Sequence, residues 1–252
     1  MDGAGVALVT GVGRRVGIGA AVAIALARQG HDVAFTWWGP YDARVHGVNE
    51  DAFHDELAAQ IERMDRRVAA IEVDLALPES APLLFDEVER ALGPVSVVVL
   101  AHCESVDAGI LDTTVESFDR HVAVNVRGSW LVMREFARRF RGPFTSGRII
   151  SLTSDHTVSN LAYGASKGAL DRITIAAARE FADRGITANV INPGPTDTGW
   201  MTDQQRRDLA AAAPWGRLGT PQDCARLVAF LCSKEGQWVN GQLIASDGGA
   251  SS

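Results

Sequence analysis

The sequence predicts a single doubly wound α/β domain over residues 1–252, with a central parallel sheet of about seven strands flanked by helices. Short β-rich runs alternate with segments of helical periodicity along the whole chain. Several of these runs are apolar on both faces, which is typical of parallel strands covered by helices above and below. No linker, repeat or low-complexity tract interrupts this alternation, so we expect one domain.

Each expected element has a clear local signal. The strands are expected at 6–10, 31–37, 68–73, 95–101, 147–153, 186–191 and 242–246. The helices are expected at 20–28, 50–64, 79–92, 115–140, 163–181 and 221–231. Two long stretches, 37–49 and 194–216, lack this regularity, and long loops of this kind are often functional. Within the second stretch, about 196–216, we expect a helical lid over the substrate.

Composition excludes several classes of function. The net charge of −7 argues against a nucleic-acid or anionic-membrane partner. No apolar run approaches the length of a membrane span, and the start "MDGAGVALVTG" lacks the pattern of a signal peptide. Cys103, Cys224 and Cys232 form no C-x-x-C motif. We therefore expect reduced thiols in a cytoplasmic protein, with neither disulfides nor a metal site.

A glycine-rich segment, "TGVGRRVGIG" at 10–19, follows the first expected strand. In a doubly wound sheet, ligands bind at the carboxyl ends of the strands, beside this first strand-to-helix turn. Glycines let the backbone approach a pyrophosphate, and a helix beginning near Gly17 would point its free N–H groups at it. Glycine-rich turns are common, but this position before an alanine-rich helix favours a nucleotide-binding domain of the Rossmann type.

A second group of residues indicates chemistry. Tyr163 and Lys167 in "LAYGASKGAL" are four residues apart, so they share one face of a predicted helix. Alone, such a pair could be a surface contact. However, Ser154 ends the preceding strand at the edge where ligand should bind. Asn125 lies among apolar helical positions, where its amide needs a hydrogen-bond partner.

Together these residues resemble the short-chain dehydrogenase/reductase family over essentially the full chain. The other matching pieces are "VDL" at 73–75, "NV" at 125–126, "NPGPTDT" at 192–198, "GRLGTPQD" at 216–223 and "NGQLIASDGG" at 240–249. The chain is most similar to 3-oxoacyl-acyl-carrier-protein reductases and related ketoreductases. The resemblance implies an oxidoreductase that reduces a ketone or 3-oxoacyl carbonyl to an alcohol, or performs the reverse reaction, by hydride transfer with a nicotinamide cofactor.

The resemblance also implies roles for single residues. Tyr163 would be the acid/base, with its pKa lowered by Lys167 and the oxidised nicotinamide. Lys167 would also hold the nicotinamide ribose, Ser154 would orient the substrate oxygen, and Asn125 would keep a water in a proton relay. The implied cofactor-binding residues are Gly11, Arg14, Arg15, Gly17, Ile18, Asp74, Leu75, Ala101, Tyr163, Lys167, Pro193, Gly194, Thr196 and Thr198, with Asp74 and Leu75 at the adenine.

The chain departs from the family pattern in three places. Two extra residues lengthen the glycine loop before Gly17, as in divergent enoyl-acyl-carrier reductases, although those space the Tyr and Lys further apart. The usual N-N-A-G is replaced by "LAHC" at 100–103, where we favour packing or hydrogen bonding over catalysis for His102. Ser154 lies nine residues before Tyr163 instead of twelve or thirteen, which alters one wall of the substrate pocket.

The substrate is weakly specified. His156 in the shortened loop and Trp200 and Met201 in the lid are candidate substrate contacts, with solvent exposure or lid-to-body packing as the alternatives. The length of the glycine loop is the one feature that leaves an enoyl reductase as an alternative enzyme activity. A catalytically weak, cofactor-binding regulator is the alternative from another class, and the intact catalytic set counts against it.

NADP(H) is favoured over NAD(H). The second expected strand ends at Trp37 and Trp38, without the carboxylate that binds the ribose hydroxyls of NAD. Arg14 and Arg15 lie in the loop that passes the adenosine ribose and offer the forked donors that suit a 2′-phosphate. Asp42, a few residues after the strand, is the alternative ribose ligand.

The resemblance implies a homotetramer with two-fold axes and a small-molecule carbonyl or alcohol substrate. Helices 115–140 and 163–183 would pair with their mates, and the "NGQLIASDGG" tail would join the other interface. The apolar stripes "WLVM" and "ALDRITIAAA" would otherwise face water.

Overall fold

The sheet matches the expected architecture. The structure, a computed structural model, describes residues 5–47 and 51–251. Its seven parallel strands lie in the order β3-β2-β1-β4-β5-β6-β7. The strands are β1 (Val6–Thr10), β2 (Asp32–Trp37), β3 (Val68–Glu72), β4 (Val95–Leu100), β5 (Gly147–Leu152), β6 (Ile186–Asn192) and β7 (Leu243–Ala245). The strand order reverses between β1 and β4, and such a reversal places the ligand crevice at the carboxyl ends of these two strands.

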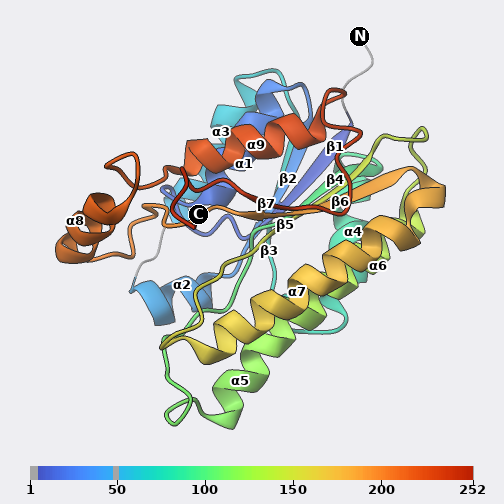
Figure 1. Ribbon diagram of the computed structural model, residues 1–252. Coiled ribbons are helices and arrows are strands. Elements are labelled where there is room, and N and C mark those ends of the chain that lie inside the picture. The colour runs from blue at the N-terminus through green and yellow to red at the C-terminus, as the bar shows by residue number, and fades with distance from the viewer. Residues whose placement is uncertain (1–4, 48–50, 252) are drawn as a thin grey trace.

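Helices cover both faces of the sheet, as Figure 1 shows. One face packs against α1 (Ile18–Arg28), α3 (Asp51–Glu62) and α9 (Pro221–Cys232). The other packs against α4 (Ser80–Ala91), α6 (Ser129–Arg139) and α7 (Leu161–Glu180). Each interface is an apolar layer that stabilises the fold by burial, with Phe35, Leu26 and Ile61 on the first face and Phe85, Phe136 and Ile149 on the second.

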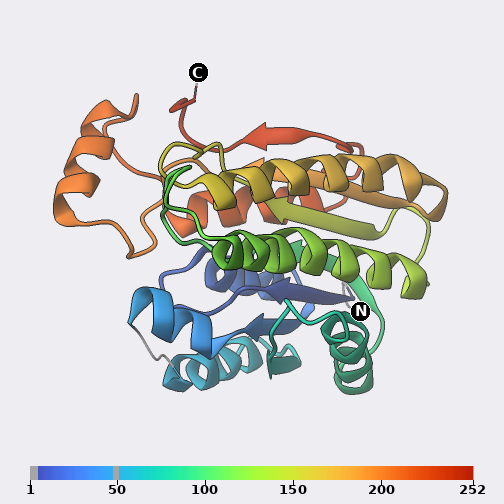
Figure 2. The ribbon, with the colours of Figure 1, turned by 90° about the horizontal axis from the view of Figure 1, so that it is seen from below.

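Two helices stand at the carboxyl edge of the sheet, on either side of the crevice. They are α2 (Gly39–His46) and α8 (Asp203–Ala212), and Figure 2 shows both at the end toward which the strands run. The prediction that 37–49 is irregular is therefore wrong for α2. Pro40 lies in its first turn, where a missing N–H costs nothing, and Gly47 ends it with a left-handed φ of 65°. The helix expected within 196–216 is present as α8, which opens with a capping box between Thr202 and Gln205.

The expected helix 115–140 is interrupted. It consists of α5 (Val115–His121), a π-helical segment (Val122–Gly128) and α6. A π-helical turn is a known mark of functional sites and is invisible to a pattern of period 3.6. A short 3₁₀ turn, Ala182–Arg184, follows α7. None of the helices in the described part of the chain is both long and apolar enough to cross a membrane.

Candidate active site

The glycine loop between β1 and α1 is shaped for close approach. Gly11 has φ of 77°, and a Cβ there would lie 2.4 Å from the backbone N of His102. A Cβ on Gly19 would lie 2.6 Å from the carbonyl oxygen of Gly11. Gly17 precedes α1, whose first turn holds no acidic residue and whose N-terminus no described side chain caps. The free N–H groups and the dipole of α1 therefore suit the pyrophosphate of a dinucleotide.

Ser154, Tyr163 and Lys167 come together at the carboxyl end of β5. Tyr163 and Lys167 lie on successive turns of α7, and the Lys167 Nζ is 5.5 Å from the centre of the Tyr163 ring. Lys167 is only 2% exposed and donates from Nζ to the carbonyl oxygen of Leu152 at 2.8 Å. The Ser154 side chain is close enough to Tyr163 to lower the pKa of its phenol. A hydroxyl, a phenol and a buried ammonium thus face one site.

Burial decides the protonation of this group. Burial raises the pKa of Tyr163 above its ordinary value, the Cys103 thiol adds to the rise, and the Ser154 hydroxyl opposes it. Burial also lowers the pKa of Lys167, against the raising effects of Cys103 and Asp171. The expected lowering of the Tyr163 pKa is thus not met by the chain's own residues, because the desolvation of the phenolate dominates.

The shortened loop between Ser154 and α7 folds over the helix. His156 donates its backbone N–H to the Ser154 Oγ at 3.1 Å. A Cβ on Gly164 would lie 2.7 Å from the His156 carbonyl oxygen, so the loop lies directly on α7. The His156 ring is exposed and contacts the carbonyl oxygen of Val158 at 3.0 Å. The alternative of an exposed loop histidine therefore describes its position.

The lid residues differ from each other. Met201 is 4% exposed, a burial that is consistent with the alternative of packing against the body of the protein. Trp200 is 47% exposed and keeps a free apolar surface.

The loop after β6 faces the glycine loop. Gly194 has φ of 61° and packs on Asp247, where a Cβ would lie 2.3 Å from the Asp247 Cβ. Thr196 donates from Oγ1 to the Pro193 carbonyl oxygen at 3.1 Å. Of the other predicted cofactor positions, the structure places each at the same edge, with Gly17 and Ile18 at the start of α1, Asp74 and Leu75 after β3, and Ala101 after β4.

The two loop arginines point in different directions. Arg14 donates from Nη1 to the Thr198 carbonyl oxygen at 2.9 Å, across the mouth of the crevice. Its Nε lies 3.7 Å from the Asp42 carboxylate. Arg15 pairs with Glu56 of α3 at 2.5 Å and lies over the Phe53 ring. Arg14 is thus a bridge between the loops, and Arg15 is a half-exposed cation beside α3.

His102 has the hydrogen-bonding role that the sequence favoured. Its Nδ1 lies 2.6 Å from the Thr10 Oγ1, and its Nε2 lies 3.2 Å from the Ser129 Oγ. Burial, and then the nearby Lys167 charge, lower the pKa of His102 to about 3. The imidazole is therefore neutral and joins the glycine loop to the start of α6.

Asn125 fixes the segment after β4 and finds the partners that its burial requires. Its Oδ1 accepts from the Glu104 backbone N–H at 2.7 Å, and its Nδ2 donates to the Glu104 carbonyl oxygen at 2.9 Å. The same Nδ2 donates to the Ser166 Oγ at 2.8 Å, on the turn of α7 that carries Lys167. Asn125, in the π-helical turn, thus connects the segment after β4 to α7.

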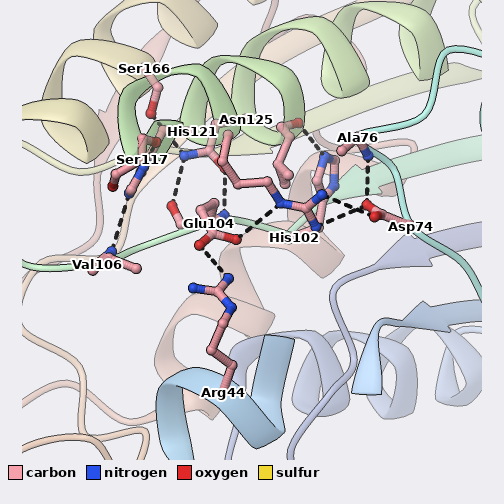
Figure 3. A network of polar contacts seen from close by, with 12 residues as sticks. Arg44, Asp74, Ala76, His102, Glu104, Val106, Ser117, His121, Asn125 and Ser166 are labelled. Atoms are coloured by element: carbon pink, nitrogen blue, oxygen red, sulfur yellow. Dashed lines mark hydrogen bonds and ion pairs between the residues drawn. The ribbon is translucent and has the colours of Figure 1, made fainter. Parts of the chain in front are cut away.

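Glu104 is the residue that the sequence interpretation missed. Its side chain is 3% exposed, lies 2.5 Å from Arg44 of α2 and 3.6 Å from Arg120 of α5, and forms the centre of the network in Figure 3. Arg120 also donates to both carboxylate oxygens of Asp74, at 3.0 and 3.1 Å. Its position directly after "LAHC" was the available signal, but its partner Arg44 lies in a helix that was not predicted.

The comparisons with known proteins agree with this geometry. A family model described as enoyl-(acyl carrier protein) reductase matches residues 11–251. The Bacillus subtilis "Uncharacterized oxidoreductase YjdA" is 39% identical over 249 residues, covering 97% of this chain and 96% of that protein. Versicolorin reductase 1 of Aspergillus parasiticus is 35% identical over 272 residues, covering 97% and 95%.

Solved structures are similar over the same length. A short chain dehydrogenase from Burkholderia cenocepacia in complex with NADP has a TM-score of 0.88 and 33% identity, covering 99% of both chains. A blue fluorescent protein from a metagenomic library, in complex with NADPH, has a TM-score of 0.87 and 32% identity, covering 98% of both. The fold, the site and these matches together show that the chain belongs to the short-chain dehydrogenase/reductase family of oxidoreductases.

Proposed function

We propose that the chain is an NADP(H)-dependent reductase of ketone or 3-oxoacyl carbonyls, which also catalyses the reverse oxidation. The observation that carries this proposal is the meeting of Ser154, Tyr163 and the buried Lys167 beside a glycine loop that suits a dinucleotide. When bound, the nicotinamide cofactor supplies or accepts the hydride.

The chain's own residues handle the proton. On reduction, the Tyr163 hydroxyl gives its proton to the carbonyl oxygen of the substrate, and in the reverse reaction it takes the proton back. Ser154 donates a hydrogen bond to the same oxygen and holds it near the phenol. The Lys167 ammonium, fixed by the Leu152 carbonyl, stabilises the phenolate that proton loss leaves on Tyr163. Asn125 holds the neighbouring Ser166 and so supports the proton path behind Lys167.

The cofactor assignment rests on the arginines. Arg15 is half-exposed and its surface pair with Glu56 is weak enough to exchange for a phosphate. Arg14 faces the crevice, and the two similar solved structures described above hold NADP or NADPH. Replacing both arginines with alanine should raise the KM for NADPH by at least about tenfold, because charge-assisted contacts are lost. The KM for NADH should barely change. A wild-type kcat/KM that is higher for NADH would overturn the assignment.

Exposed apolar side chains lie on two segments that would border the substrate. Trp200 is in the expected lid and Val158 is in the loop before α7, which favours an apolar ketone. We treat residues 1–252 as one domain with a lid at 196–216. In that arrangement Trp200 would close over the substrate, and His156 would lie at the edge of the substrate pocket.

An enoyl reductase is the second candidate, favoured by the description of the matching family model and by the length of the glycine loop. NADPH oxidation against ketones, β-ketoesters and enoyl thioesters separates the two. Our proposal predicts turnover with the first two classes. Turnover with enoyl thioesters alone would favour the second candidate, and no turnover with any of them would favour a cofactor-binding regulator.

We further propose a cytoplasmic homotetramer. Exposed apolar side chains lie along α5 and α6, at Phe118 and Trp130, and near the C-terminus, at Trp238 and Leu243. Faces of this kind usually mark interfaces. Light scattering at micromolar concentration should give the tetramer mass, and a monomer mass would contradict this assembly.

A further inference from the structure

Helix α2 crosses the mouth of the cofactor crevice. It follows β2, yet its Arg44 reaches Glu104, which follows β4. In the sheet order, β1 and its glycine loop lie between these two strands. The contact therefore passes over the carboxyl end of β1, where the pyrophosphate of a dinucleotide would lie.

Asp42 of α2 rests on the glycine loop itself. A Cβ on Gly13 would lie only 2.1 Å from the Asp42 Oδ2, so the carboxylate fills the space that the missing side chain leaves. The Asp42 side chain is 11% exposed and lies 3.7 Å from the Arg14 Nε. A phosphate-binding loop thus already holds an anion and a guanidinium that pairs with it.

A second contact holds α2 in this position, through Arg44 and the segment that follows β4. Arg44 pairs with Glu104 at 2.5 Å, and Glu104 is fixed by both backbone hydrogen bonds to Asn125. Figure 3 shows Arg44 reaching from α2 to this buried carboxylate. The Arg44 Cζ lies over the Tyr41 ring, 5.8 Å from the centre of that ring. The anchor is rigid, whereas the Arg44 side chain is 51% exposed and can leave it.

We propose that α2 is an autoinhibitory clamp, in which Asp42 is an internal anion that a phosphate of the incoming dinucleotide must displace from Gly13 and Arg14. The Arg44–Glu104 ion pair holds the clamp shut. The inference rests on the proposed function only in taking a nicotinamide dinucleotide as the ligand. It follows that the carboxylates of Asp42 and Glu104 oppose cofactor entry. Arg14 pairs with a cofactor phosphate once Asp42 has left.

The test measures NADPH binding without turnover, by stopped-flow energy transfer from the protein's tryptophans to the nicotinamide. Arg44→Gln should raise the association rate constant about fivefold, the effect of losing one half-exposed ion pair. Asp42→Asn should raise the association rate constant at least as much, and it should lower the Kd for NADPH, because the competing carboxylate is gone. Arg67→Gln is the matched control, because it breaks a comparable ion pair with Asp32 away from the crevice, and it should leave both constants unchanged.

Each other outcome overturns the clamp. Weaker NADPH binding in Arg44→Gln would make Arg44 a cofactor ligand, and weaker NADH binding in Asp42→Asn would make Asp42 a ribose ligand. Unchanged rates in both variants, with thermal unfolding like that of wild type, would show that α2 does not limit entry. The clamp test measures NADPH binding and needs no turnover. If the chain proves not to reduce carbonyls, the expected changes in the NADPH association rate of Arg44→Gln and Asp42→Asn still hold, so the failure of the proposed function can be told apart from the failure of the clamp.

Discussion

The floor of the site and its rims are built differently. In the floor, formed by the end of β5 and the first two turns of α7, Lys167 is buried at 2% exposure, and Ser154 and Tyr163 are partly buried. The rims are α2 and α8. In α2 only Asp42 is buried, and in α8 no residue is. Burial fixes Lys167, one of the side chains that we propose to act on the proton, while exposed helices held by ion pairs and caps can move and let ligands pass.

The first prediction concerns the floor and has the largest effect. Tyr163→Phe removes the phenol that exchanges the proton while keeping the aromatic ring, so turnover should fall about 10³-fold or more. The Kd for NADPH should stay close to that of wild type, because the cofactor contacts remain. A variant that stays within a few-fold of wild-type turnover would place the proton transfer elsewhere.

Ser154→Ala tests whether the floor also sets the protonation of Tyr163. It removes a hydroxyl that lowers the pKa of Tyr163 and that is a donor to the substrate oxygen. Turnover should fall about 10²-fold, and the pH profile of alcohol oxidation, which needs the phenolate, should move to higher pH. Asp155→Asn, an exposed neighbour in the same loop, is the control. A loss of turnover with an unmoved profile would restrict Ser154 to positioning.

The same contrast explains what the sequence could reveal. The floor is encoded locally, since the spacing of Tyr163 and Lys167 places both on one helix face and Ser154 lies two residues after the end of β5. The rim contacts join distant segments, such as Arg44 with Glu104, and no local pattern encodes them. Helix α2 was hidden by its opening Gly-Pro pair, which resembles a loop although proline suits a first helical turn.

The π-helical turn shows a second limit. The apolar spacing of 115–140 predicted one continuous helix, and the extra residue per turn that presents Asn125 leaves no mark in that spacing. Asn125 itself was found by a different argument, namely that a buried amide must have partners. The strands β1, β2, β4, β5 and β6 were found because their apolar runs report burial on both faces, whereas β3 and β7, at the two edges of the sheet, are mostly not buried.

His102 links the start of α6 to the glycine loop, and its replacement should change how stability depends on pH. Burial lowers its pKa to about 3 in the folded chain, from the ordinary value of 6.5 that we expect in the unfolded chain. Between these values the unfolded chain binds a proton that the folded chain does not. The free energy of unfolding therefore falls as the pH falls, by up to about 1.4 kcal/mol per pH unit from this residue.

His102→Gln should lose this contribution. Urea unfolding of wild type and variant at several pH values between 6.5 and 4 measures it, because the contributions of all other groups cancel in the difference. Stability curves that run parallel for the two proteins would show that His102 is not held neutral by burial.

The smallest effect is expected at the rim. Thr202→Ala removes the N-cap of α8 and its capping box with Gln205, which should weaken that helix by about 1 kcal/mol. Because α8 is exposed, faster hydrogen exchange at 204–208 should report the change while global unfolding stays the same. A matching loss of global stability would mean that this rim belongs to the core.

The central claim, that this site reduces a carbonyl, is tested most directly by following one atom. Wild-type protein is given a ketone accepted in the substrate panel and NADPH that carries deuterium at the transferred C4 position. Mass spectrometry should find one deuterium on the former carbonyl carbon of the product alcohol, and almost no labelled product with Tyr163→Phe. Deuterium on a carbon of a reduced C=C bond of an enoyl thioester, with the ketone left unlabelled, would contradict the account.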